Sequence, residues 1–252
     1  MIRRSLLLIA FMLMSSSVKA DIVTQWNFNS STPDANAATG TLTPSVGVGT
    51  ASLLGTTSTF ASGSANGGST DPAGTNDNSG WNTTTYAAQG TGDLSRGVQF
   101  GVSTVGFQDI QVTWDQRHSN TSSRFWALLY TTDGSTWNTF SATGAGTDSG
   151  LYAGVTGDIW FNQRTADLSG IAGVNDNPNF GIRIVASFAP GQSSYTASSP
   201  TGTYATSGTA RFDMVTISGS ISAIPEPSSV LLTAAVACGY LSRRPWRRKL
   251  AV

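Results

Sequence analysis

The sequence predicts an all-β protein: an antiparallel β-sandwich of jelly-roll type, followed by one short C-terminal transmembrane helix. Residues 97–219 contain short segments of alternating apolar and polar residues, which is the period of a strand with one buried face. Loops rich in Gly, Asn and Ser separate these segments, and no helical pattern of normal length precedes residue 228. A short apolar run from Val230 to Leu241 follows near the C-terminus.

The first expected strand begins at Asp21, and its alternation places Trp26 in the core. Residues 29–96 are poor in large apolar side chains and rich in Gly, Ser, Thr and Asn, so we expect long loops or edge strands there. The later expected strands cover residues 97–103, 108–117, 124–131, 158–165, 179–188 and 210–221.

Three of these strands carry further information. Residues 124–131 are apolar on both faces, which predicts a central strand, and Asp133-Gly134 then favours a hairpin turn. Residues 108–117 place Trp114 on an apolar face, as a core residue. In residues 210–221 the apolar phase slips between Met214 and Val215, which predicts a β-bulge.

Residues 1–20 have the pattern of a secretory signal peptide. Arg3 and Arg4 precede the apolar residues 5–14, and small residues lead to a cleavage site after Ala20. We therefore expect signal peptidase to release a domain of residues 21–223. Its six arginines, thirteen aspartates and lack of Lys and Glu give a formal charge of −7. An acidic domain of this kind is unsuited to nucleic acid, which is bound through clustered Lys and Arg.

The only cysteine, Cys238, falls in the terminal apolar run, so the expected exported domain has no internal disulfide and must be stabilised by burial.

Residues 224–249 contain three different segments in a fixed order. A turn formed by Pro225, Glu226 and Pro227 comes first, and a predicted transmembrane segment at about 229–242 follows. A cationic cluster that favours the cytoplasmic side ends the stretch, with Arg243, Arg244, Arg247 and Arg248.

Residues 224–249 resemble the PEP-CTERM sorting signal of Gram-negative bacteria. This resemblance implies processing near the Pro-Glu-Pro motif by an exosortase, a transient anchor in the inner membrane, and an association with exopolysaccharide. The sequence departs from the commoner pattern at Ile224, in the short apolar run and in the interruption by Pro245-Trp246. Residues 130–137, 173–184 and 209–219 also look like parts of secreted bacterial lectin-like or carbohydrate-module-like sandwiches, which implies architecture only.

A candidate sugar-binding face lies on the expected strand 158–165. Trp160 shares one strand face with Asp158, Asn162 and Arg164, and a second aromatic candidate, Trp81, lies in the expected loop 78–82. An aromatic ring stacks on a pyranose while neighbouring polar groups bond its hydroxyls. The alternative for either tryptophan is packing in the core.

Evidence for catalysis is sparse, and we predict no enzyme. His118, the only histidine, is expected in a loop, and no Gly-x-Ser-x-Gly motif supplies a nucleophile. A carbohydrate-active enzyme, either a glycoside hydrolase or a lyase, stays open as the alternative, because glycoside hydrolysis needs only two carboxylates and Asp115, Asp176 and Asp213 are available.

No cofactor is predicted beyond a candidate calcium site with Asp71 and Asp77 as oxygen ligands, without the ligand spacing of an EF-hand.

The function expected from all of these sequence features is that of an exported protein of the cell envelope, cell surface or exopolysaccharide matrix, either structural or carbohydrate-binding. Its expected partners are signal peptidase, an exosortase and extracellular polysaccharide.

Overall fold

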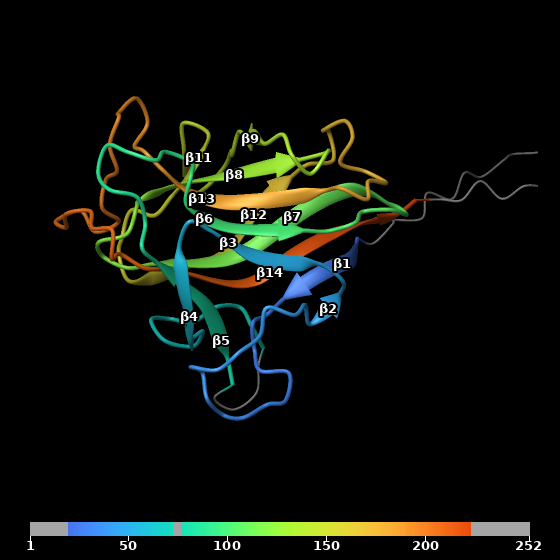
Figure 1. The fold of residues 1–252 in the computed structure, drawn as a ribbon, viewed down its shortest axis with the longest axis horizontal. Coiled ribbons are helices and arrows are strands. Elements are labelled where there is room, and N and C mark those ends of the chain that lie inside the picture. The colour runs from blue at the N-terminus through green and yellow to red at the C-terminus, as the bar shows by residue number, and fades with distance from the viewer. Residues whose placement is uncertain (1–19, 73–76, 223–252) are drawn as a thin grey trace, which may run out of the picture. The chain divides into compact units, whose positions relative to one another are not determined.

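The computed structural model describes residues 20–72 and 77–222 of the chain, which divides into two compact units, 1–221 and 222–252. The described residues form fourteen strands in two antiparallel sheets, shown in Figure 1. The predicted all-β class and sandwich-like arrangement are therefore confirmed. The jelly-roll type stays a prediction. Within the described ranges no helix has the length and apolar character that a membrane span requires.

Two of the predicted regions lie outside the described residues: the signal peptide before residue 20 and the whole stretch 224–249. The Pro-Glu-Pro turn, the transmembrane segment and the arginine cluster thus stay predictions from the sequence.

The first sheet has the strand order β12-β7-β14-β1-β2, with β5 beside the start of β14 and β4 beside β5. Its strands are β1 (Asp21–Trp26), β2 (Val46–Gly47), β4 (Thr57–Ser62), β5 (Ser79–Thr84), β7 (Phe107–His118), β12 (Ile159–Asp167) and β14 (Ala210–Ile221). The long strands β7 and β14 pair along most of their length and form the centre of this sheet.

The second sheet has the order β10-β11-β8-β13-β6-β3, with β9 paired to β8. Its strands are β3 (Thr50–Leu54), β6 (Gly97–Gly101), β8 (Phe125–Thr131), β9 (Asn138–Phe140), β10 (Thr147–Asp148), β11 (Leu151–Ala153) and β13 (Gly181–Ser187). β8 lies between β11 and β13, as predicted for the segment that is apolar on both faces. The hairpin predicted after it is also present, because β8 pairs with β9.

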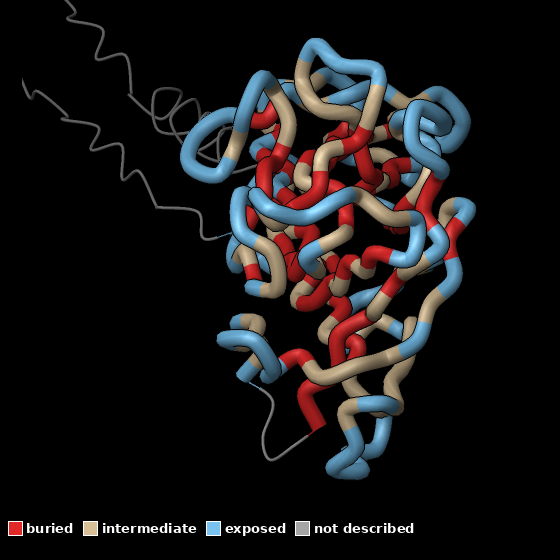
Figure 2. The backbone as a smooth tube through the Cα atoms, turned by 90° about the vertical axis from the view of Figure 1, so that its left-hand side faces the viewer, coloured by how far each residue is buried: buried red, intermediate tan, exposed pale blue. Residues whose placement is uncertain are grey.

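The core contains large aromatic side chains from both sheets. The ring of Trp26 lies 4.9 Å from that of Phe100, and Phe28 lies 5.5 Å from Trp81, centroid to centroid. Figure 2 shows the buried backbone running through the middle of the unit, with exposed loops around it. Burying a side chain of this size contributes about 1.5–3 kcal/mol, so these contacts replace the missing disulfide as a source of stability.

The segment 29–96 is more regular than its composition predicts, since it contributes four strands. Residues 79–84 form β5 rather than a loop, with small residues where the sheet is crowded. A Cβ on Gly80 would lie 2.6 Å from Cγ of Arg211, so a larger residue here would displace the Arg211 side chain. Ser, Gly and Asn are typical of loops, whereas in β5 their small size permits close packing within the sheet.

Two strands contain bulges. In β14 the register with β7 shifts between Asp213 and Thr216, and Met214 has φ of 48°, which confirms the predicted bulge. In β12 an unpredicted shift lies between Phe161 and Arg164, where Gln163 has φ of 54°. Phe161 pairs with Gln116 and Arg164 pairs with Trp114, so β12 advances by three residues where β7 advances by two. The side chains after the bulge therefore change face.

Candidate ligand-binding sites

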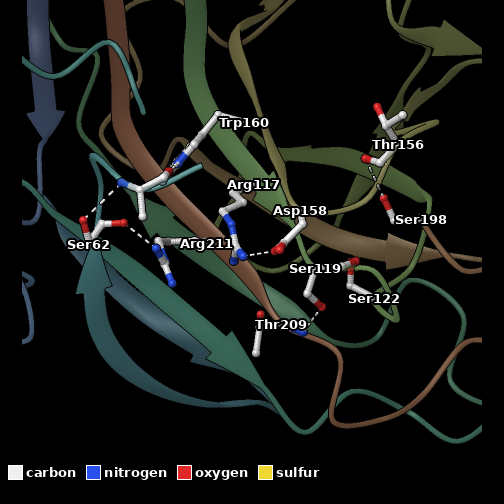
Figure 3. Close-up of polar contacts among 11 residues, drawn as sticks. Ser62, Arg117, Ser119, Ser122, Thr156, Asp158, Trp160, Ser198, Thr209 and Arg211 are labelled. Atoms are coloured by element: carbon white, nitrogen blue, oxygen red, sulfur yellow. Dashed lines mark hydrogen bonds and ion pairs between the residues drawn. The ribbon is translucent and has the colours of Figure 1, made fainter. Parts of the chain in front are cut away.

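The outer face of the first sheet carries a row of large side chains at paired positions. Trp160 on β12 pairs with Arg117 on β7, which pairs in turn with Arg211 on β14. Arg117 forms an ion pair with Asp158, and Arg211 donates to the carbonyl oxygen of Ser62, as drawn in Figure 3. The predicted ligand residues Asp158 and Trp160 are thus neighbours, together with two arginines that the sequence did not single out.

A loop of residues 63–71 covers this row, and polar side chains of the row donate hydrogen bonds to backbone carbonyls of the loop. Nε1 of Trp160 donates to the carbonyl oxygen of Ala65 over 2.8 Å, and Nδ2 of Asn162 donates to that of Gly68 over 2.9 Å. Only 8% of Trp160 is exposed. In this arrangement the indole holds the loop on the sheet and offers no open face to a sugar ring.

Two buried aspartates secure the same loop. Asp115 and Asp213 are paired across β7 and β14. Oδ2 of Asp115 accepts from the backbone N–H of Thr70 over 2.5 Å and from its hydroxyl over 2.7 Å. Oδ2 of Asp213 accepts from the hydroxyl of Ser69 over 2.7 Å. Burial raises the pKa of Asp213 well above its ordinary value, opposed by the bond from Ser69.

These two carboxyls were the first candidates for glycoside hydrolysis, and in this structure they bond the loop above them. The third candidate, Asp176, lies elsewhere in the fold, where its Oδ1 accepts from the backbone N–H of Gly106 over 2.8 Å. The three therefore do not form one site among the described residues.

Trp81 and His118 both differ from expectation. Trp81 lies in β5 and is 1% exposed, with its ring 6.1 Å from that of Phe100, so it belongs to the core. His118 is the last residue of β7 instead of a loop residue, because pairing with both β12 and β14 extends to it. Burial between Trp126 and Phe161, followed by the nearby positive charges, lowers the pKa of His118 well below its ordinary value.

The candidate calcium ligands lie near the start of β5. Oδ2 of Asp71 accepts from Nδ2 of Asn29 over 2.7 Å, and Asp77 is buried with 5% of its surface exposed. Over the described ranges, no group of three or more His, Cys, Asp or Glu side chains is arranged to hold a metal ion. Calcium at Asp71 and Asp77 stays a prediction.

Arg164 lies on the opposite face of β12 from Trp160, which corrects the prediction that they share a face. The bulge at Gln163 inserts one residue and turns Arg164 inward. Its guanidinium lies 4.9 Å from the ring centre of Phe161 and 5.5 Å from that of Tyr152, within cation–π range. Nη2 donates to the carbonyl oxygen of Ala153 over 3.1 Å, while Nε has no hydrogen-bond partner.

A cavity of about 240 Å³ adjoins Arg164 at the edge where β12 of the first sheet faces β10 and β11 of the second. Its lining includes Thr143, Thr147, Tyr152, Phe161, Asn162 and Arg164. Desolvation by burial lowers the pKa of Arg164 to about 9, so the side chain is still cationic at neutral pH. We call this cavity the edge pocket.

A second cavity, of about 280 Å³, lies where β6 ends and β13 begins, and is called here the Trp137 pocket. The guanidinium of Arg183 lies 3.8 Å from the ring centre of Trp137, and its Nε donates to Oε1 of Gln99 over 2.7 Å. The lining includes Gln99, Ser103, Thr131, Trp137 and Asn179. In the sequence, Trp137 lies between the polar residues Thr136 and Asn138, just after the turn that follows β8. A tryptophan with polar neighbours beside a turn is the sequence signal that could have pointed to a partly exposed indole.

The fold and these pockets define an antiparallel, sandwich-like domain with polar and aromatic cavities. No protein-family model and no curated protein matches the sequence. Among solved structures, modules of an endo-1,4-β-D-xylanase of Clostridium thermocellum, complexed with xylohexaose, match 83% of this chain at 11% identity and a TM-score of 0.44.

Two further structures are similar at comparable levels. A cleaved adhesin domain of Lys-gingipain matches 77% of this chain at 12% identity, with a TM-score of 0.37. The enzymatically active domain of tailspike protein 4 of Bacteriophage CBA120 matches 69% at 13% identity, with a TM-score of 0.35. This chain spans 30% of the xylanase chain, 96% of the adhesin chain and 19% of the tailspike chain. These values assign no family.

Proposed function

We propose that this protein is an exported, non-enzymatic component of the cell surface or exopolysaccharide matrix, and that it binds carbohydrate at the Trp137 pocket. The observation that carries the proposal is the position of Trp137. Of the tryptophans in the described residues, five are buried and Trp137 is the one with partial exposure. A partly exposed indole beside carboxamides and hydroxyls suits the apolar face and the hydroxyls of a sugar ring.

The surroundings of Trp137 favour a preformed site. Arg183 stacks on the indole and is itself held by Gln99, so both the ring and the guanidinium have restricted freedom before a ligand arrives. Such preorganisation reduces the entropy that binding must overcome. Gly181 supports this packing, because a Cβ there would lie 3.3 Å from the edge of the Trp137 ring.

Export and sorting are proposed from the sequence alone. Signal peptidase removes residues 1–20, and an exosortase then acts near Pro225, Glu226 and Pro227 while the segment at about 229–242 holds the chain in the inner membrane. The test is the mass and location of the mature protein in its native host. The double variant Pro225→Ala and Glu226→Ala is expected to keep its C-terminal segment and stay in the membrane. Unchanged mass and location would refute the sorting proposal.

Carbohydrate binding is tested with a glycan array probed by the full-length protein. The Trp137→Ala variant is expected to lose roughly tenfold or more in affinity, the equivalent of about 1.4 kcal/mol for one aromatic stacking contact. Val155→Ala is the matched control, because Val155 is 59% exposed and lies outside the Trp137 pocket. An array on which no neutral glycan is bound, or equal binding of neutral glycans by Trp137→Ala, would refute the proposal.

The alternative function is a carbohydrate-active enzyme, favoured only by the paired buried carboxyls of Asp115 and Asp213. Incubation of the protein with a panel of polysaccharides separates the two functions. We expect no new reducing ends and no unsaturated products. Reproducible release of sugars that is lost in Asp213→Asn would establish the enzyme instead.

A further inference from the structure

We propose that the edge pocket binds the carboxylate of an acidic sugar such as a uronic acid, with Arg164 as its ion-pair partner. This site is separate from the Trp137 pocket in residues and location, since the two linings share no side chain.

The first argument is the missing counter-charge. Two arginines in the described residues are buried, and each is 8% exposed. Arg117 has a carboxylate partner in Asp158, whereas Arg164 contacts rings and one carbonyl oxygen. A buried guanidinium without an anion is costly, because removing its hydration is compensated only when charge and hydrogen bonds replace the water. An anionic ligand would supply both.

The second argument is how the strand presents this cation. Regular alternation would place Arg164 on the outer face with Trp160, and the bulge at Gln163 turns it into the edge pocket instead. The bulge is held from the other face, since the N–H of Gln163 donates to Oδ1 of Asp115. Bulges of this kind commonly re-aim side chains at functional sites.

The third argument concerns the lining of the pocket. None of its residues is acidic, and its lining combines the threonines Thr143 and Thr147 with the rings of Tyr152 and Phe161. Carboxylates accept paired bonds from a guanidinium, hydroxyls bond sugar hydroxyls, and rings pack on the apolar face of a pyranose. At about 240 Å³ the cavity is below the ~300 Å³ where pockets for drug-sized ligands begin, so one sugar unit fits it better.

The test is calorimetric titration of the full-length protein, in detergent, with D-galacturonate and D-glucuronate. The neutral sugars D-galactose and D-glucose, and the anions acetate and sulfate, are the comparison ligands. We expect a uronate to bind at least tenfold more tightly than its neutral counterpart and than acetate or sulfate. Equal binding of uronate and neutral sugar, or of acetate and uronate, would overturn the proposal.

Two variants locate the binding. Arg164→Lys keeps the charge and loses the planar fork, so uronate affinity is expected to fall tenfold or more. Because a buried arginine can be needed for folding, Ala145→Phe is the second variant. Ala145 is exposed and lines the edge pocket, so a larger side chain there blocks it without entering the core. Uronate affinity unchanged in both variants would overturn the proposal. Trp137→Ala is expected to leave this affinity intact, which separates the two sites.

Discussion

The backbone N–H of Gln163 donates a hydrogen bond of 2.7 Å to Oδ1 of Asp115. The other oxygen of Asp115 accepts two bonds from Thr70 in the covering loop. One buried carboxyl therefore stabilises both the β12 bulge, which aims Arg164 inward, and the loop on the outer face of the first sheet.

Replacing Asp115 with Ala is expected to lower the free energy of unfolding by about 3 kcal/mol, because three donors lose their buried acceptor. Urea unfolding measures this change. Asp148→Ala is the control, since Asp148 is exposed and its carboxylate accepts a hydrogen bond from the neighbouring Ser149 at the surface. A loss no larger than that of the control would contradict the role given to Asp115.

Asp213 is expected to make stability fall as the pH rises. Burial raises the pKa of its carboxyl, so the folded state holds a proton that the unfolded state releases above about pH 4. The stabilisation is complete below the unfolded pKa and is lost as the pH rises through the folded value. Asp213→Asn keeps the shape of the side chain but removes the titrating carboxyl. Melting temperatures at closely spaced pH values from 4 upward should show a flatter profile for the variant, and parallel profiles would count against this assignment.

His118 is expected to be neutral throughout the physiological range. Its folded pKa is lowered by burial, so the stability that it contributes is present above about pH 6.5 and is lost as the pH falls through the folded value. Because the sequence contains one histidine, its imidazole signals in an NMR titration are unambiguous. A midpoint near 6.5 would show an exposed ring and contradict the buried position.

The covering loop is expected to depend on Gly63. A Cβ at this position would lie 1.6 Å from Oδ1 of Asn78 and 2.8 Å from Oδ2 of Asp213, so Gly63→Ala must displace one of them. We expect a loss of about 1–3 kcal/mol and faster proteolysis within residues 63–71. Gly170→Ala is the control, since a Cβ there meets no atom within 4 Å. Similar behaviour of the two variants would refute the crowding at Gly63.

The sequence predicted the fold where one face of a strand is apolar, and it failed where packing depends on small polar residues. Alternation identified β7 and β13, and a phase slip identified the β14 bulge. β5 was missed because its Ser, Gly and Asn residues are typical of loops. The β12 bulge was missed because Asn162, Gln163 and Arg164 are all polar, so no apolar phase exists to slip.

The candidate site was predicted only in part for the same reason. Asp158 and Trp160 are neighbours as expected, but the loop that covers them returns from residues 63–71, and contacts so distant in the sequence leave no local pattern. The exposure of Trp137 is likewise a property of the folded chain.

Retention of the protein on exopolysaccharide from its own host tests the central claim most directly. Wild type and Trp137→Ala, both full length, are sedimented with the insoluble polysaccharide in excess free D-galacturonate and D-glucuronate, which keep the edge pocket occupied, and the bound fractions are compared with that of Val155→Ala. Carbohydrate binding at Trp137 predicts that wild type and Val155→Ala sediment alike while Trp137→Ala stays largely in solution. Equal sedimentation of all three, or of none, would contradict it.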